Sequence, residues 1–175
     1  MTGDLPTPAD ERIMTDRLEL APVTADDAEP MSDVANDQSL YEFIGGGPAT
    51  VEERRAAFER LAAARSADQG NTAQRNWVVR RRADEQVVGM LIATFSGHGD
   101  TAEVASIIGV PWQGQGLASE ANLAVVDWLN ARGVRVIIAR IHPHHHAAEA
   151  MATRAGFQPT GDYHDQLQIW RWQRR

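Results

Sequence analysis

Alternating apolar and polar positions predict a series of short strands in the first two thirds of the chain. Arg17 to Leu20 alternates with the period of a strand that buries one face. Trp77 to Arg81 and Val87 to Phe95 read as two strands around the polar turn 82–85, so they predict a hairpin. Glu103 to Val110 is predicted as a further strand.

Two helix starts are predicted before the hairpin. Thr24 precedes a pair of aspartates that suit the positive end of a helix dipole, and Pro30 then indicates a kink or a late start. After the loop 43–50, Thr50 and Glu53 have capping-box spacing. The buried stripe of this second helix is expected at Phe58, Leu61 and Ala62.

The last third of the chain alternates helices with strands. A helix is predicted from about Gln115 to Arg132, ended by Gly133, with one apolar face at Leu117, Ala121, Ala124, Val125, Trp128 and Leu129. Val134 to Ile141 is nearly all apolar, which predicts a strand buried on both faces. A short helix, 147–155, is closed by Gly156.

The tail 166–172 alternates and predicts a last strand. Its run Ile169 to Trp172 is interpreted as an amphipathic edge strand that packs its tryptophans, with a binding surface as the alternative. The whole pattern predicts an α/β (α+β) fold: one mixed sheet with helices on both faces and a right-handed crossover between its middle strands. Residues 13–175 are expected to form a single domain behind a flexible tail, residues 1–12.

Composition then narrows the function classes. The chain has 175 residues, 43% of them hydrophobic, and no apolar run approaches the roughly 18 residues that span a bilayer. Its acidic, proline-bearing start does not resemble a secretory signal, so we expect a cytoplasmic protein with no membrane partner. The net charge of −7 disfavours a nucleic-acid partner; it mildly favours a cationic substrate, although a solvated acidic surface is the commoner explanation.

The residue types that are missing exclude several chemistries. Without cysteine the chain forms no disulfide, thiolate metal site or cysteine nucleophile. All 17 basic residues are arginine, so Schiff-base chemistry and the phosphate-binding lysine of nucleotide-triphosphate loops are excluded too. The arginine run 80–82 is interpreted as a solvated face beside the turn, with an anion site as the alternative.

A glycine turn is the most informative local feature. Gly114 and Gly116 stand where a strand passes directly into a helix, a place where backbone N–H groups can cradle a phosphate. A dinucleotide-binding fingerprint would need glycine at Ser119 and an acidic residue at Ile141 or His142, so that interpretation fails. An ordinary tight turn before an amphipathic helix is the alternative.

The stretch Gln113-Gly114-Gln115-Gly116-Leu117-Ala118 resembles the Q/R-x-x-G-x-G/A signature of the GNAT N-acetyltransferase superfamily. The sequences TDRLEL, FIGGGP and MATRAGFQPTGD, in this order, are similar to the branch that includes the ribosomal-protein alanine acetyltransferases. The resemblance covers roughly residues 13–175. It implies a mostly antiparallel sheet of six or seven strands with a splayed central pair, acetyl-CoA as cosubstrate, and a primary amine as acceptor.

The resemblance also implies site residues. Backbone groups of Ile108 and Val110 would pair with the pantetheine arm of the cofactor like an added strand. The substrate amine would enter from the opposite side, past the first two helices and the glycine loop 45–47. His145 occupies the position where the family typically has an asparagine that contacts this arm. The pyrophosphate would be held by Gln113, Gly114, Gln115, Gly116, Leu117 and Ala118, with the Ser119 hydroxyl nearby.

For catalysis, the resemblance implies Glu103 as the general base, with Asp100, Asp165 and His145 as further candidates. The acid is where this sequence departs from the family, because Ala152 replaces its frequent tyrosine and Ala148 the serine of the ribosomal branch. The only tyrosines, Tyr41 and Tyr163, have no spacing that would assign them this role.

Three functions are therefore weighed. The first is an acetyl-CoA-dependent N-acetyltransferase that acts on a protein N-terminus or a small-molecule amine, as a monomer or homodimer. The second is a catalytically weak acyl-CoA-binding or sensory module, favoured by the two missing hydroxyls. The third is a metal-dependent hydrolase centred on the histidines of residues 142–146, but no metal is expected because too few ligands converge there.

Overall fold

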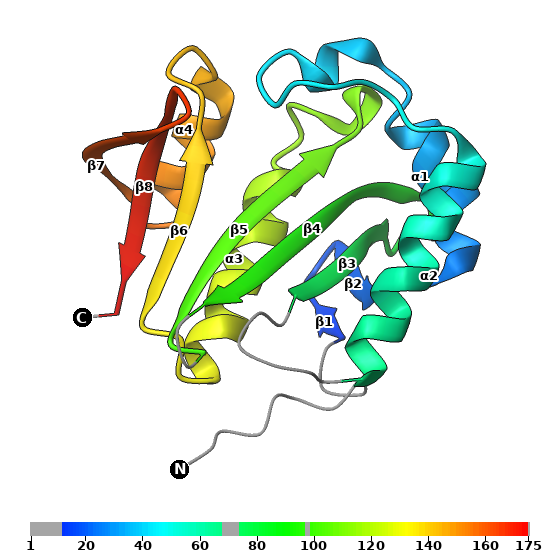
Figure 1. Ribbon diagram of the computed structural model, residues 1–175, viewed down its shortest axis with the longest axis horizontal. Helices are drawn as coiled ribbons and strands as arrows, with labels where there is room; N and C mark the ends of the chain where they lie inside the picture. The colour runs from blue at the N-terminus through cyan, green and yellow to red at the C-terminus, as the bar shows by residue number, and fades with distance from the viewer. Residues whose placement is uncertain (1–11, 68–73, 97–98, 175) are drawn as a thin grey trace.

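The computed structural model describes residues 12–67, 74–96 and 99–174 (Figure 1). Residues 1–11, most of the expected tail, lie outside this range. One sheet of eight strands runs in the order β1-β2-β3-β4-β5-β6-β8-β7. Its strands are β1 (Ile13–Met14), β2 (Leu18–Pro22), β3 (Gln74–Arg81), β4 (Val87–Ser96), β5 (Thr101–Ile108), β6 (Val136–Ile141), β7 (Gln158–His164) and β8 (Leu167–Gln173).

Helices cover both faces of the sheet, as predicted (Figure 1). On one face, called here the α1/α2 face, α1 (Ala28–Val34) and α2 (Val51–Ala67) pack on β3 and β4. On the other, the α3/α4 face, α3 (Leu117–Ala131) packs on β5 and α4 (His146–Arg154) on β6. Short 3-10 turns complete the chain: η2 (Ala25–Asp27), η3 (Gln38–Tyr41) and η4 (Val110–Trp112).

Successive side chains along each strand point to opposite faces of the sheet, so the hydrophobic core consists of two clusters, one on each face. Trp77 and Val79 of β3 join the cluster under α3, whereas Val78, between them, joins the cluster under α1 with Met31 and Phe58. The edge of Trp77 meets the ring of Trp128 on α3, with centroids 5.3 Å apart. Apolar burial of this kind contributes about 25 cal/mol per Å², so these two clusters hold the helices against the sheet.

The helix starts follow their caps. Thr50 and Glu53 form the predicted reciprocal capping box at the start of α2. Thr24 caps η2 through Asp27, and α1 begins only at Ala28, which places Pro30 in its first turn, where proline is tolerated. Gly133 ends α3 with a positive φ of 89°, as predicted.

The central strands β5 and β6 are parallel and separate after three residue pairs. Thr101, Ala102 and Glu103 pair with Val136, Ile137 and Ile138, and no later pair joins the two strands within the described chain. On its other side, β5 stays paired with β4 as far as Ile108. The two strands therefore diverge toward the top of Figure 1, which is the splay that the resemblance implied.

Several predictions about strands were wrong. The sheet has eight strands rather than six or seven. β7 was missed, because this edge strand is exposed throughout and has no apolar alternation. Val110 belongs to η4 and not to β5, which ends at Ile108.

Two further predictions concerned burial and position. β6 is not buried on both faces, since Ile137 and Ile141 are buried while Val136 and Ile138 are half-buried on the α1/α2 face. β8 is not an edge strand, because it lies between β6 and β7. Its tryptophans do pack inward as predicted: Trp170 is buried, and Trp172 packs against the same core.

Candidate active site

The glycine turn leads directly into the start of α3. Gly114 and Gly116 have φ of 74° and 78°, in the left-handed region that favours glycine. Gly116 is the N-cap of α3 and brings no capping side chain. The first hydrogen bond within the helix runs from the Glu120 N–H to the Gly116 carbonyl, at 3.1 Å. The N–H groups of residues 117–119 come before it and have no acceptor within the helix. Such a terminus favours an anion.

A brace from the first strand region holds this turn. The Arg17 guanidinium donates to the Gln115 carbonyl (2.9 Å) and to the Glu120 carboxylate (2.6 Å). Thr15 donates a second bond to Glu120, at 2.6 Å. Burial by itself raises the pKa of Glu120, but the hydrogen bonds from Thr15 and Arg17, with the guanidinium charge, outweigh it and lower that pKa. This brace was not predicted from the sequence, although Arg17 lies in the TDRLEL stretch.

A cleft of about 470 Å³ opens from this turn, between β5 and α4. Most of the cofactor residues expected from the sequence line it: Ile108, Gln113, Gly114, Gly116, Leu117, Ala118, Ser119 and His145. The described lining also includes residues that the sequence analysis did not select: Ser106, Trp112, Ala147, Ala148, Ala150, Met151 and Arg154. Arg154 is the cationic side chain among these described lining residues.

Two expected cofactor residues do not line the cleft. Val110 lies in η4, where its carbonyl accepts from the Gln113 N–H at 3.2 Å. Gln115 turns its amide to the Pro111 carbonyl at 3.1 Å. Gln113 itself does line the cleft, and its side chain donates to the Ile108 carbonyl at 2.9 Å, so this carbonyl already has a partner.

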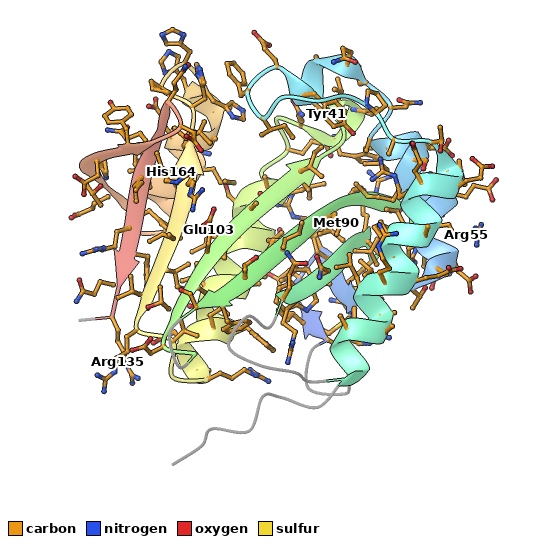
Figure 2. The ribbon with its side chains drawn as sticks, in the orientation of Figure 1. Tyr41, Arg55, Met90, Glu103, Arg135 and His164 are labelled. Atoms are coloured by element: carbon orange, nitrogen blue, oxygen red, sulfur yellow. The ribbon has the colours of Figure 1, made fainter. Side chains whose placement is uncertain are left out.

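The expected general base lies where the splay begins. Glu103 is the last residue of β5 that pairs with β6, and its side chain stands on the α1/α2 face between these strands (Figure 2). The Arg140 guanidinium from β6 forms an ion pair with it at 3.0 Å; both side chains are about a third exposed, at 34% and 35%. A second Arg140 nitrogen lies 3.4 Å from Nδ1 of His164.

Two of the other candidate bases, Asp100 and Asp165, are less well placed. Asp100 lies ahead of β5, where its carbonyl accepts from the N–H groups of Arg135 and Val136. Asp165 lies in the turn after β7, with its side chain 88% exposed. Neither residue lines the cleft.

The histidine cluster meets the loop before α2 across the mouth of the splay. The rings of His145 and Phe43 are stacked with centroids 4.5 Å apart, and His142 lies 5.3 Å from the same phenyl ring. Burial lowers the pKa of His145, and the nearby Glu42 carboxylate partly opposes this shift. Within residues 12–67, 74–96 and 99–174 no group of three or more candidate ligands could hold a metal ion. His98 lies outside the described residues.

The cleft offers few hydroxyl groups. Ala148 lines it and Ala152 is buried, so the two positions at which the resemblance would lead one to expect hydroxyls carry methyl groups here. Tyr41 donates its hydroxyl to the Ala35 carbonyl at 2.8 Å, and Tyr163 is exposed on β7. Ser106 lines the cleft, and its oxygen accepts from the buried Asn122 amide at 3.0 Å.

Comparison with known families and structures gives one consistent result. The family described as acetyltransferase (GNAT) domain matches residues 17–158. No curated protein matches the sequence significantly. In the part of the chain that the structure describes, no helix is long and apolar enough to cross a membrane.

Among solved structures, the chain is similar to RimL, a ribosomal L7/L12 alpha-N-protein acetyltransferase in complex with coenzyme A, with a TM-score of 0.79, 16% identity, and coverage of 93% of this chain and 97% of that one. A ribosomal-protein-S5-alanine acetyltransferase from Vibrio fischeri gives 0.79, 13% identity, and coverage of 93% and 96%. The enzyme AAC(6')-Ib, in complex with paromomycin and acetyl-CoA, gives 0.73, 18% identity, and coverage of 91% and 94%. At these identities the likeness shows the fold.

Proposed function

Because the chain belongs to the acetyltransferase (GNAT) domain family, we propose that it transfers the acetyl group of acetyl-CoA to a primary amine by direct attack on the thioester. One observation carries the proposal: the uncapped start of α3 and the splay of β5 from β6 border the same cleft. The pyrophosphate of acetyl-CoA could therefore bind at the helix start while its acetyl group lies at the splay. We expect the reaction to take place in the cytoplasm.

The described residues fit acetyl-CoA in charge and shape. A Cβ on Gly114 would meet nothing within 4 Å, and one on Gly116 only the Arg17 side chain, so a ligand can reach the backbone of the turn directly. The N–H groups of Leu117, Ala118 and Ser119 would hold the pyrophosphate, with Arg154 as a further cation. The half-buried ring of His145 would contact the pantetheine arm, beside backbone groups of β5.

The proposed chemistry uses the face opposite the cofactor. Acetyl-CoA supplies an acetyl thioester when bound. An amine can attack the carbonyl carbon of this thioester directly, without a covalent enzyme intermediate. As the N–C bond forms and the C–S bond breaks, the Glu103 carboxylate accepts the proton that the amine loses, directly or through one water molecule. Backbone N–H groups of β5 at the splay would stabilise the charge on the carbonyl oxygen.

No side-chain acid is assigned to the departing thiolate. Among the described residues, the hydroxyls that line the cleft are those of Ser106 and Ser119, and the Ser106 oxygen accepts a hydrogen bond from the Asn122 amide. A thiolate is a stable enough leaving group to depart without an acid, since an ordinary thiol has a pKa near about 8.5. The proposed mechanism therefore requires one base and no protein acid.

The alanines at 148 and 152 favour a second candidate function, an acyl-CoA-binding module with weak turnover. Both candidates predict coenzyme A binding, but only the enzyme predicts a product. The test is to incubate the protein with acetyl-CoA and a panel of primary amines, both peptides and small molecules, and to detect a gain of about 42 Da by mass spectrometry. Binding without turnover on any member of the panel would favour the module, and absence of binding would overturn both.

A further inference from the structure

A row of mostly polar side chains crosses the open part of the α1/α2 face. Strand register aligns one residue from each of six neighbouring strands, and Glu103 stands near the middle of the row. In sheet order these residues are Gln74, Thr94, Glu103, Ile138, Arg171 and Gln158. Gln74 and Thr94 are joined by a hydrogen bond of 3.2 Å. This side of the sheet is therefore built to face polar groups.

Negative and positive side chains lie on different strands of this part of the sheet. The carboxylate of Glu103 lies on β5, and the next strands carry the guanidinium groups of Arg140 and Arg171. Arg140 is engaged with Glu103 and His164, and Asp165 lies 3.1 Å from the same imidazole nitrogen. Arg171 is exposed and has no ion-pair partner among the described residues, so its charge is available to a ligand.

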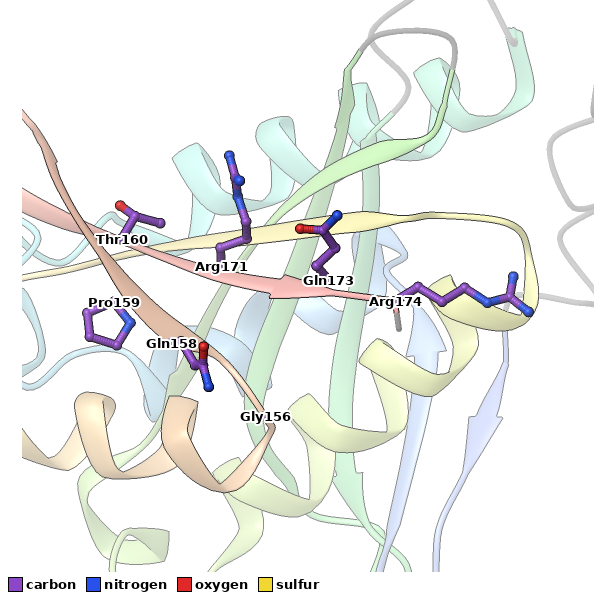
Figure 3. Close-up of a pocket in the computed structure, with 7 residues that line it drawn as sticks. All are labelled: Gly156, Gln158, Pro159, Thr160, Arg171, Gln173 and Arg174. Carbon is purple, nitrogen blue, oxygen red and sulfur yellow. The ribbon is translucent and has the colours of Figure 1, made fainter.

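Arg171 also lines a second pocket, of about 350 Å³, beside β8 and the start of β7 (Figure 3). Arg171 and Gln173 project from the same side of β8. The described residues that line the pocket include two arginines and no acidic group: its polar side chains are Gln158, Thr160, Arg171, Gln173 and Arg174. This composition suits an anion with hydrogen-bonding oxygens, such as a carboxylate.

The spacing connects this pocket to the proposed base. Glu103 and Arg171 are both register partners of Ile138, so two strand intervals separate them, about 10 Å at roughly 4.8 Å each. An extended peptide advances about 3.4 Å per residue, so about three steps span this distance, and a chain whose amine lies at Glu103 brings its third or fourth residue beside Arg171.

From this geometry we propose that the acceptor carries an acidic group near its amine, and that Arg171 and its pocket bind this group. The proposal rests on the acetyltransferase function and names its substrate class: peptide N-termini with an aspartate or glutamate at the third or fourth position. The net charge of −7 would by itself favour a cationic acceptor, but the local charges beside Glu103 are positive.

The test compares three C-terminally amidated peptides that differ only at positions three and four: Ser-Ala-Asp-Asp, Ser-Ala-Asn-Asn and Ser-Ala-Lys-Lys, each extended by the same neutral tail. The wild type should acetylate the acidic peptide with kcat/KM about fivefold above the neutral one, the factor of an exposed charge pair. Arg171→Gln should remove this preference, so that the acidic and the neutral peptide react with equal kcat/KM. Arg171→Glu should shift the preference to the lysine peptide.

Arg60→Gln, an equal charge change on the exposed side of α2, is the matched control and should keep the wild-type preference. Preference should also shrink between 0.1 M and 1 M salt, since the screening length falls from about 10 Å to about 3 Å. Equal rates on all three peptides, or a preference that survives Arg171→Gln, would overturn the acidic-acceptor proposal while the acetyltransferase function stands. Failure to acetylate any of the peptides and the wider amine panel would instead count against the function itself.

Discussion

Gly116 allows a sharp test of the proposed cofactor cradle, because Gly133 provides a matched control at the other end of α3. Both glycines have a positive φ, 78° and 89°. A Cβ at Gly133 would meet no atom within 4 Å, and a Cβ at Gly116 only the Arg17 guanidinium at 3.5 Å, which is ordinary contact. The steric cost of alanine is therefore small at both positions, and the backbone strain is nearly the same.

The magnitude follows from the left-handed conformation. A non-glycine residue in this conformation destabilises the folded state by about 1–2 kcal/mol. Alanine also lowers the conformational entropy of the unfolded chain, which favours folding by roughly 0.4–1 kcal/mol and so offsets part of this cost. For a domain of this size, each 1 kcal/mol shifts the midpoint by about 2–4 °C. Gly116→Ala and Gly133→Ala should thus lower Tm by a similar few degrees in thermal unfolding.

Only Gly116→Ala should affect the cofactor, since its new methyl group would stand where the proposed pyrophosphate approaches the backbone. We expect coenzyme A affinity to fall by about tenfold or more, a cost of roughly 1.4 kcal/mol, while Gly133→Ala keeps the wild-type Kd within about twofold. Isothermal titration calorimetry at a temperature well below both midpoints measures this. Equal Kd values for the two variants would refute the assignment of the cradle.

Four further expectations follow from the structure. Glu103→Gln should lower kcat by about 10²–10⁴-fold without weakening coenzyme A binding, because its side chain stands outside the cleft lining; full turnover would exclude it as the base. Arg154→Gln should raise the Kd for coenzyme A about fivefold in calorimetry, and an unchanged Kd would place the phosphates elsewhere. Asp27→Ala should cost about 2–3 kcal/mol in urea unfolding because it leaves Arg80 without its buried partner, whereas Asp26→Ala, at an exposed neighbour, should change little. The NMR titration of His145 should have its midpoint below about 6.5, because burial disfavours the charged ring and lowers its pKa. The stability that the neutral ring contributes is therefore complete above the unfolded-state pKa and is lost as the pH falls through the folded-state pKa. A midpoint above about 6.5 would contradict the burial argument.

The elements with strong local signals were predictable from the sequence. The capping box of Thr50 and Glu53 and the apolar face of α3 depend on residues close in sequence, and both appear as expected. β7 was missed because an exposed edge strand needs no apolar alternation, and its pairing with β8 is decided by the neighbouring strand. Val110 was placed in β5 because an apolar residue after a strand gives no sign of the 3-10 turn that follows.

The site could be predicted only in its contiguous part. The turn from Gln113 to Ser119 is a local motif, and its lining residues could be named from the sequence. Arg154 lines the same cleft only because α4 packs against β6 and α3, which is a tertiary outcome. The approach of Arg140 to Glu103 depends on the register of parallel strands more than 30 residues apart in sequence, and nothing local encodes it.

The division of the sheet at the splay coincides with a division along the chain. Every strand on the far side of the splay, together with α4, comes from the continuous segment Val136–Gln173, while Glu103 and the glycine turn precede it. Arg140, Arg171 and the second pocket all lie in this segment. A junction at Gly133, an exposed position where a Cβ would meet no atom within 4 Å, therefore separates Glu103 and the glycine turn from a segment that carries Arg171 together with the cleft residues His145 and Arg154. Replacing that segment as a unit would therefore alter the proposed acceptor side and one wall of the cofactor cleft together.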